Sequence, residues 1–477
     1  LGTDASNDVL VFTEDDERFF CGLGRDKDDS FVYIGCSSAI TDEVWLLEAD
    51  RPEAEFRCVQ PREIGVEYAV MHHEDQFLVL TNVEAENFRV MTTPSDAPGR
   101  ANWKELVGHR DDVMLTGFDC QGDYLVLFER TEGITRISTR RWSDGQLETI
   151  DQPESVYTVW PGANPTSDTN VFRYGYSSMV SPPSVYTIDL STGGRTLLKE
   201  TEVLGGFDRS DYCTERIWAD ADDGTRIPIS IVARVDRADE PGPCVLYGYG
   251  AYESSVDPTF SAARLSLLDR GFVFAVAHVR GGGEMGRRWY LDGKFSQKPN
   301  TFTDTIACAR ALLAAGLTTP EQLGLRGASA GGLLVGAVLN QAPELFGAAV
   351  AQVPFVEALN TMLDPIMPLT VTEGEEWGNP GQSEEIYDVM AAYSPYENVR
   401  PAAYPAVFAT AGISDPLVGY WEPAKWVLRL REATTSVKPI LLWTELGAGH
   451  GGPTGRYAAW TEEARTLAFL VSELGAV

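Results

Sequence analysis

The chain has 477 residues, of which 44% are hydrophobic and 23% are charged, which is the composition of an ordinary globular protein of two or three domains. This composition excludes a disordered, collagen-like or coiled-coil chain, and the longest apolar runs are too short for a membrane helix. The 70 acidic residues outnumber the 38 basic residues and give a net charge of −32, which argues against nucleic acid or an anionic membrane as the main partner.

Short aromatic and β-branched runs, separated by polar turn residues, fill the first 207 residues and predict strands. A strand opens at Phe31, Phe77, Tyr124 and Phe172, so the pattern repeats every 46 to 48 residues, and a partner strand follows each time. Such a period is typical of the four-stranded blade of a β-propeller. A β-sandwich with coincidental spacing is the alternative. We expect residues 1–207 to form about four blades of a propeller.

Strands alternate with helices from residue 208 to residue 477, which predicts a doubly wound, mostly parallel α/β sheet. The expected strands include Cys244–Tyr247, Leu323–Arg326, Ala406–Thr410 and Ile440–Glu445, and the expected helices include Leu333–Ala342 and Thr461–Leu474.

Seven cysteines are scattered along the chain, an odd number without the spacing of a metal site. They predict free thiols in a reducing compartment, hence a cytoplasmic protein. We expect neither a metal nor a cofactor. The chain begins at Leu1 without a signal-peptide pattern, which indicates a processed start or a fragment.

The run Gly327-Ala-Ser-Ala-Gly matches the Gly-x-Ser-x-Gly turn that exposes a nucleophilic serine, here Ser329, between a strand and a helix. The context fits, because an expected strand precedes the run and an expected helix follows it. Only small flanking residues fit such a sharp turn, and the helix N-terminus stabilises developing negative charge. A glycine-rich turn that only packs is the alternative.

A catalytic acid and then a histidine must follow the serine in an α/β-hydrolase domain. His450 is the only one of the five histidines that does so, and it lies in a glycine-rich loop after the last expected strand. Asp415 follows the strand before it, whereas the other aspartates in between follow no strand. We therefore predict that Asp415 orients His450, which accepts the proton of Ser329.

The oxyanion of an acyl-transfer reaction needs two hydrogen-bond donors. The backbone N–H of Ala330, next to the nucleophile, is one candidate. The second is the phenol of Tyr249, in the loop that follows the strand Cys244–Tyr247. A run of three glycines after His278 and Arg280 looks like a lipase oxyanion loop, but it follows another strand, and we interpret it as a structural turn.

The chain resembles the prolyl oligopeptidase family, and within it most closely the oligopeptidase B branch. Six motifs carry the resemblance: Tyr247-Gly-Tyr-Gly-Ala-Tyr, Arg280-Gly-Gly-Gly-Glu-Met-Gly, Gly327-Ala-Ser-Ala-Gly-Gly, Glu375-Glu-Trp-Gly-Asn-Pro, Tyr420-Trp-Glu-Pro-Ala-Lys-Trp and Gly449-His-Gly-Gly. The resemblance implies a serine peptidase of the α/β-hydrolase fold with Ser329, Asp415 and His450 as its triad. It also implies Tyr249 as oxyanion donor and a propeller that limits access to short peptides. We expect a monomer or small homo-oligomer.

The same resemblance implies cleavage after Arg or Lys, because Glu373 and Glu375 align with glutamates that receive the basic side chain. Asp257 matches an acidic position linked to a second basic residue upstream. In the family a second acid stands two residues after this position. Here Thr259 takes its place, which implies a weaker preference for dibasic sites. Leu417 stands where some members carry a substrate-binding Arg. In so acidic a chain, a solvated loop is the alternative for the glutamates.

The family's propeller has seven blades and follows a segment that packs on the hydrolase domain, so we expect this chain to be truncated at its N-terminus. The open edge of the incomplete propeller would then favour aggregation. Other hypotheses remain open: a prolyl oligopeptidase, an acylaminoacyl-type peptidase or esterase on the same triad, or a propeller scaffold whose truncated hydrolase domain is inactive.

Overall fold

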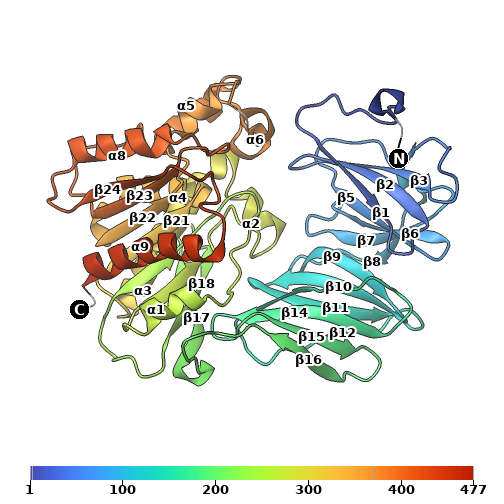
Figure 1. The fold of residues 1–477 in the computed structure, drawn as a ribbon, viewed down its shortest axis with the longest axis horizontal. Helices are drawn as coiled ribbons and strands as arrows, with labels where there is room; N and C mark the ends of the chain where they lie inside the picture. Colours follow the sequence, from blue (N-terminus) through green and yellow to red (C-terminus); the bar gives the residue numbers. More distant parts are fainter. Residues whose placement is uncertain (1, 3, 368, 476–477) are drawn as a thin grey trace.

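The computed structural model describes residue 2, residues 4–367 and residues 369–475, which form two parts of different architecture (Figure 1). Residues up to Glu200 form four separate antiparallel sheets of four strands each, and residues from Tyr212 onward form one eight-stranded sheet flanked by helices. The boundary drawn at residues 207 and 208 lies in the segment that connects them. Within the described residues, no helix is long and apolar enough to cross a membrane.

Each small sheet is one blade, and it pairs its four strands in chain order. The second strand of each blade contains the predicted opening residue and the third is the predicted partner, so the repeat is confirmed and the β-sandwich is excluded. The strands are β1 Phe20–Arg25, β2 Phe31–Ser37, β3 Asp42–Glu48 and β4 Arg57–Cys58; β5 Tyr68–His73, β6 Gln76–Thr81, β7 Arg89–Pro94 and β8 Lys104–Val107; β9 Met114–Gln121, β10 Tyr124–Thr131, β11 Ile134–Arg141 and β12 Leu147–Thr149; β13 Tyr157–Pro161, β14 Val171–Ser178, β15 Ser184–Asp189 and β16 Arg195–Glu200.

Three of the four aromatic residues that open the repeats pack between neighbouring blades. Phe31 and Phe77 pack together between the first two blades, and Phe172 packs with Tyr174 between the last two. Phe77 and Phe172 are completely buried. Burial of one such side chain contributes roughly 2–3 kcal/mol to the stability of the fold. The aromatic repeat in the sequence therefore reflects contacts that hold neighbouring blades together.

The eight-stranded sheet has the order β17-β18-β20-β19-β21-β22-β23-β24, and the strands from β20 to β24 are parallel. Its strands are β17 Tyr212–Asp220, β18 Arg226–Arg234, β19 Cys244–Tyr247, β20 Val273–Ala277, β21 Leu323–Ala328, β22 Ala348–Gln352, β23 Ala406–Gly412 and β24 Ile440–Glu445. The helices are α1 Ala262–Leu268, α2 Arg287–Leu291, α3 Pro299–Ala314, α4 Ala330–Gln341, α5 Ala358–Met362, α6 Thr370–Trp377, α7 Glu384–Tyr393, α8 Trp421–Ala433 and α9 Arg456–Leu474. Short 3₁₀ turns lie at Ala5–Asn7, Arg100–Asn102, Arg209–Asp211, Phe295–Gln297 and Pro343–Leu345.

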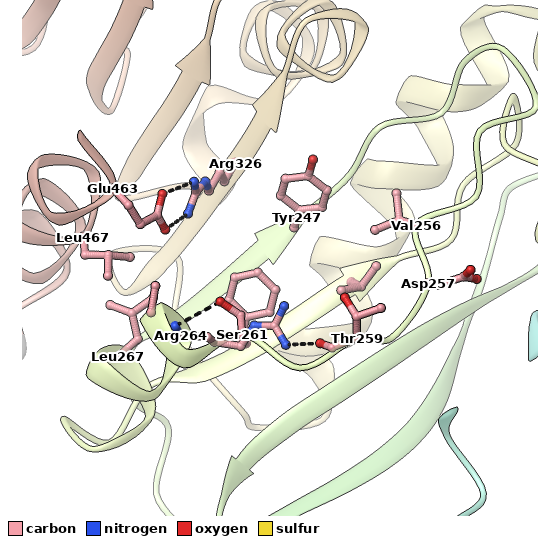
Figure 2. Close-up of a pocket in the computed structure, with 13 residues that line it drawn as sticks. Tyr247, Val256, Asp257, Thr259, Ser261, Arg264, Leu267, Arg326, Glu463 and Leu467 are labelled. Carbon is pink, nitrogen blue, oxygen red and sulfur yellow. Dashed lines mark hydrogen bonds and ion pairs between the residues drawn. The ribbon is translucent and has the colours of Figure 1, made fainter. Parts of the chain in front are cut away.

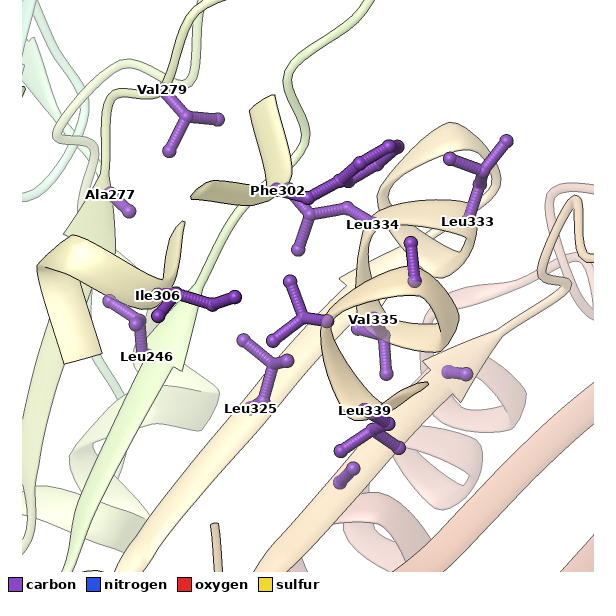
Figure 3. Packing of buried hydrophobic residues seen from close by; sticks show 14 of the residues in the cluster. Leu246, Ala277, Val279, Phe302, Ile306, Leu325, Leu333, Leu334, Val335 and Leu339 are labelled. Atoms are coloured by element: carbon purple, nitrogen blue, oxygen red, sulfur yellow. The ribbon is translucent and has the colours of Figure 1, made fainter. Parts of the chain in front are cut away.

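Helices cover both faces of this sheet, which makes it doubly wound as predicted. Helices α3, α4 and α8 lie on one face, and α1 and α9 lie on the other. Figure 3 shows part of the buried cluster that α4 forms with the sheet, in which Leu334 and Val335 of the helix lie with Leu325 of β21. Because parallel strands end at the same edge, the loops after β19, β21, β23 and β24 meet there, as in other open α/β sheets that bind ligands.

Candidate active site

Ser329 occupies a sharp turn between β21 and α4. Its φ of 56° lies in the left-handed region, which is unusual for a residue with a side chain. The turn is held by hydrogen bonds: the N–H of Ser329 donates to the carbonyl of Gln352 at 2.8 Å, and the N–H of Gly332 donates to the Ser329 carbonyl at 2.8 Å. This is the geometry predicted for a nucleophile turn, and it lifts the serine above the edge of the sheet.

The glycines on either side of Ser329 are required by close backbone contacts. A Cβ at Gly327 would lie 2.1 Å from the carbonyl oxygen of Gly331, and a Cβ at Gly331 would lie 2.6 Å from that of Gly248. Both neighbours are main-chain atoms that cannot rotate away, so the small residues in this turn are a steric necessity.

We expect Gly327→Ala to lower the free energy of unfolding by about 3 kcal/mol, because the added methyl group overlaps the Gly331 carbonyl. Gly374→Ala in α6 is the matched control. An added Cβ meets nothing within 4 Å there, so the better helix propensity of alanine should raise the free energy of unfolding by about 0.5–1 kcal/mol. Urea denaturation measures both variants. Equal effects of the two substitutions would contradict the steric account of the turn.

Asp415, His450 and Ser329 form one continuous line of hydrogen bonds. The Nδ1 atom of His450 lies 2.7 Å from Oδ2 of Asp415, and its Nε2 atom lies 3.0 Å from Oγ of Ser329. With the carboxylate on its Nδ1 side, the imidazole carries its proton there and presents a free lone pair to the serine hydroxyl. The three predicted triad residues are thus brought together from the ends of β21, β23 and β24.

The Asp415 carboxylate is fixed from its other side. Its Oδ1 atom accepts hydrogen bonds from the backbone N–H groups of Leu417 and Val418, at 2.8 and 2.9 Å. Its side chain is 1% exposed, whereas that of His450 is 20% exposed. The acid is therefore a buried orienting group, while the imidazole is partly exposed and lines the cavity beside Ser329.

Ala330 and Tyr249, the two predicted oxyanion donors, flank the serine. Ala330 is the first residue of α4, so its N–H has no acceptor within the helix. Tyr249 lines the same cavity as Ser329 and His450. Burial, reinforced by nearby acidic and phenolic groups, raises the pKa of Tyr249 to about 12. The phenol therefore stays protonated, and able to donate, throughout the neutral range.

A cavity of about 270 Å³ opens beside Ser329. Its wall is mostly apolar and carries one carboxylate, that of Glu373, whose Oε2 accepts a hydrogen bond from Nε1 of Trp377 at 2.8 Å. Burial raises the pKa of Glu373 above its ordinary value, and the bond from Trp377 acts in the opposite direction. The remaining lining residues are Tyr249, Tyr252, Phe355, Thr361, Met362, Met367, Leu369, Thr370, Leu417, Val418 and His450.

Comparison with known proteins assigns the chain to a family. Residues 1–201 match the model of the prolyl oligopeptidase N-terminal beta-propeller domain, and residues 258–477 match that of the prolyl oligopeptidase family. The chain is 44% identical to a dipeptidyl aminopeptidase BI from Pseudoxanthomonas mexicana and 41% identical to a protease 2 from Moraxella lacunata, over its full length in both cases. The chain belongs to the prolyl oligopeptidase family.

The solved structure of oligopeptidase B from Leishmania major superimposes on the whole chain with a TM-score of 0.95 at 41% identity. The predicted fold, part of a β-propeller followed by an α/β-hydrolase domain, is therefore confirmed. The chain spans 66% and 68% of the two curated relatives and 68% of the solved chain. The chain thus spans about two thirds of the length of each of these relatives.

Glu375 does not lie in the cavity with Glu373, contrary to the expectation that the two carboxylates share one pocket. The segment is the helix α6 rather than a loop, and residues two apart on a helix point to different sides. Glu375 faces the first blade, where its Oε2 accepts a hydrogen bond from the N–H of Ala39 at 3.1 Å and its Oε1 lies 3.6 Å from Arg18. Glu375 therefore joins the two parts of the chain.

Asp257 is also placed away from Ser329. It lies with Thr259 on the wall of a separate cavity of about 430 Å³ (Figure 2). Its carboxylate forms an ion pair with Arg130 of β10 at 2.7 Å and accepts a hydrogen bond from Thr158 at 3.3 Å. In this arrangement Asp257 is a contact between the propeller and the hydrolase domain. Leu417, by contrast, lines the cavity beside Ser329.

His278 lies outside the site, in agreement with its interpretation as part of a structural turn. It is completely buried, and its Nε2 atom lies 2.7 Å from the hydroxyl of Ser230. Burial lowers the pKa of this imidazole. It is a buried core histidine whose Nδ1 atom faces the carboxylate of Glu284 at 3.7 Å, without a hydrogen-bond partner among the described residues.

Two buried charges that support the Tyr249 loop were not predicted. Lys298 donates from Nζ to the carbonyl of Gly250, next to Tyr249, and burial lowers its pKa to about 8. Glu376 accepts hydrogen bonds from the N–H of Tyr252 at 2.9 Å and from the hydroxyl of Tyr290 at 2.6 Å. The available signal was weak: Lys298 is one of only seven lysines in the chain, and Glu376 lies in the Glu-Glu-Trp motif.

Proposed function

We propose that the protein is a serine oligopeptidase that hydrolyses short peptides through an acyl-enzyme intermediate. The observation that carries this proposal is the line of hydrogen bonds from Asp415 through His450 to Ser329. Oγ of Ser329 attacks the substrate carbonyl while Nε2 of His450 takes its proton and later delivers it to the leaving amine. A water molecule then hydrolyses the ester by the same steps in reverse. Asp415 stabilises the imidazolium that forms in between.

Tyr249 and the N–H of Ala330 would stabilise the oxyanion in both steps. We expect Tyr249→Phe to reduce kcat by about 100-fold and to change KM little, because the bond is made mainly in the transition state. Steady-state kinetics on a peptide substrate measure this effect. Tyr457→Phe, an exposed residue of α9, is the control and should leave kcat unchanged. A larger effect on KM than on kcat for Tyr249→Phe would assign this residue to binding instead.

We propose that the protein cleaves preferentially after Arg or Lys, because the cavity beside Ser329 carries a single carboxylate on an otherwise mostly apolar wall. Glu373 is half-buried, so a guanidinium or ammonium would replace the solvation that the carboxylate has lost. The resemblance to oligopeptidase B points to the same residue. Glu375 and Asp257 would act indirectly, by holding the propeller against the hydrolase domain. That contact would limit access to the site to short peptides.

Fluorogenic peptides that end in Arg, Pro or Phe before the scissile bond test this specificity. Turnover mainly of the Arg peptide supports the proposal, and equal turnover of all three would place the specificity elsewhere. Hydrolysis of esters but of no peptide would make the protein an esterase. A chain that neither turns over a substrate nor reacts with a serine-directed probe would be a scaffold.

Release of dipeptides from free amino termini is a second candidate, favoured by the 44% identity to the dipeptidyl aminopeptidase. An aminopeptidase must bind the substrate's ammonium group, whereas an oligopeptidase does not need it. Paired dipeptide substrates with free and with acetylated amino termini separate the two. Comparable kcat/KM values for both members of a pair identify an oligopeptidase, and a strict need for the free terminus identifies dipeptide release.

A further inference from the structure

The first blade brings two cysteines directly opposite each other. Cys21 of β1 pairs with Cys36 of β2 in the antiparallel register, and their Sγ atoms lie 2.8 Å apart. Opposed residues of antiparallel strands have Cα atoms about 4.5–5.5 Å apart, which falls within the span of about 4.4–6.8 Å that a disulfide bridges. The register alone therefore places the two thiols where a bond can form without movement of the backbone.

A metal ion is the other occupant that this cluster suggests, because the carboxylate of Glu14 lies near both sulfurs. Both oxygens of that carboxylate already have partners in the protein. Its Oε2 forms an ion pair with Arg62 at 2.5 Å, and its Oε1 accepts a hydrogen bond from the N–H of Asp16 at 2.9 Å. Two thiols then remain, whereas structural zinc sites have four ligands. The geometry favours a bond between the sulfurs over a metal.

We propose that Cys21 and Cys36 form a reversible disulfide and that this pair is a redox modification site of the first blade. A small disulfide such as oxidised glutathione serves as the oxidant. The thiolate of Cys21 attacks one of its sulfurs and releases one glutathione thiol, which leaves a mixed disulfide on Cys21. The thiolate of Cys36 then attacks Sγ of Cys21 and releases the second glutathione thiol. Two cysteine thiols are oxidised and one glutathione disulfide is reduced.

The different environments of the two cysteines support this order of steps. Cys21 is exposed to solvent, whereas the side chain of Cys36 is completely buried. Burial, reinforced by the neighbouring Cys21 thiol, raises the pKa of Cys36 to about 12. Cys21 is thus the thiol that an incoming disulfide meets, and Cys36 is the resolving thiol, which acts only on the adjacent mixed disulfide.

The position of the pair gives the bond a structural consequence. It lies one residue from the open end of the β1–β2 hairpin, whose last pair is Phe20 with Ser37. Just beyond that end, Arg18 and the N–H of Ala39 both contact Glu375 of α6. The disulfide would therefore clamp together the two segments of the first blade that touch the helix carrying Glu373.

The test oxidises the folded chain with glutathione disulfide, maps the peptides by mass spectrometry and measures hydrogen exchange. We expect a Cys21–Cys36 crosslink that dithiothreitol reverses. Some β1 amides exchange only when β1 separates from β2. A crosslink between two positions 15 residues apart should slow the exchange of these amides about 100-fold. Cys21→Ser and Cys36→Ala should each abolish both effects. Cys213→Ser, which removes another exposed thiol, should leave both unchanged.

Two results would overturn the proposal. One is glutathione attached to Cys21 or Cys213 without any Cys21–Cys36 crosslink, because the oxidant would then have reached the thiols and the pair would have failed to close. The other is one tightly held zinc ion per chain that is lost in both the Cys21→Ser and the Cys36→Ala variant, which would make the pair part of a metal site.

Discussion

Replacement of Ser329 by alanine should reduce kcat by about a millionfold, the loss typical of removing the nucleophile of a serine peptidase. Oγ of Ser329 is the atom aligned with Nε2 of His450 at 3.0 Å, and the substitution removes only this atom. The oxyanion donors Tyr249 and Ala330 stay in place, so KM should change little. The measurement is turnover of an Arg-ending fluorogenic peptide by the variant and by the wild-type chain.

Ser472→Ala is the matched control, because Ser472 is exposed on α9, away from the triad, and its removal should leave kcat unchanged. Circular dichroism must show that the Ser329→Ala variant keeps its fold, which is expected because the substitution adds no atom to the tight turn. If the folded Ser329→Ala variant kept a tenth or more of the wild-type kcat, the assignment of the nucleophile would be wrong.

Replacement of Glu373 by glutamine should lower kcat/KM for an Arg-ending peptide by about 100-fold and leave that for a Phe-ending peptide unchanged. A hydrogen bond to a charged partner in a partly desolvated site contributes about 1.5–3 kcal/mol, and the amide cannot supply the charge. The isosteric substitution keeps the shape of the cavity. The measured quantity is the ratio of kcat/KM for the two substrates.

Glu375→Gln is the control, two residues along the same helix, since Glu375 contacts Ala39 and Arg18 rather than the cavity. Its effect should be the same for both substrates, because it would act through the contact with the propeller. A selective loss of Arg cleavage in Glu375→Gln, with none in Glu373→Gln, would reverse the assignment of the two glutamates.

The Arg preference should also depend on pH with a predictable sign. Burial raises the pKa of Glu373, so on acidification this carboxylate takes up its proton at a higher pH than an ordinary glutamate does. The protonated group has no charge to attract a guanidinium, and the Arg-to-Phe ratio of the wild-type chain should therefore fall as the pH falls. The ratio of the Glu373→Gln variant should stay flat over the same range. A wild-type ratio that rises on acidification would contradict this role.

The triad could be predicted from the sequence because each of its members follows a strand of one parallel sheet. Once β21, β23 and β24 were recognised, the common edge of the sheet placed Ser329, Asp415 and His450 together. The blade repeat was predictable for a similar reason, because an aromatic residue at or next to the start of the second strand of each blade recurs at the period of the blades. Both inferences need only local periodicity and the rule that parallel strands end at one edge.

The orientation of the two acidic side chains of α6 could not be predicted in the same way. The motif gives their positions in the chain, but only the phase of the helix α6 shows that Glu373 and Glu375 face different partners. The ion pair of Asp257 with Arg130 could not be predicted either, because Arg130 comes from a strand 127 residues away. The role of Lys298 could not be predicted for the same reason, since the Tyr249 loop that it supports lies 48 residues away in the sequence.

The most direct test of the central claim is the mass of the adduct that a fluorophosphonate forms with the wild-type chain, followed by mapping of the labelled peptide. We predict one adduct per chain, located on Ser329, with labelling strongly slowed in His450→Gln because the imidazole no longer takes the serine's proton. An adduct on another serine, or labelling of Ser329 at the same rate in His450→Gln, would contradict the proposal that Ser329, His450 and Asp415 act as one catalytic unit.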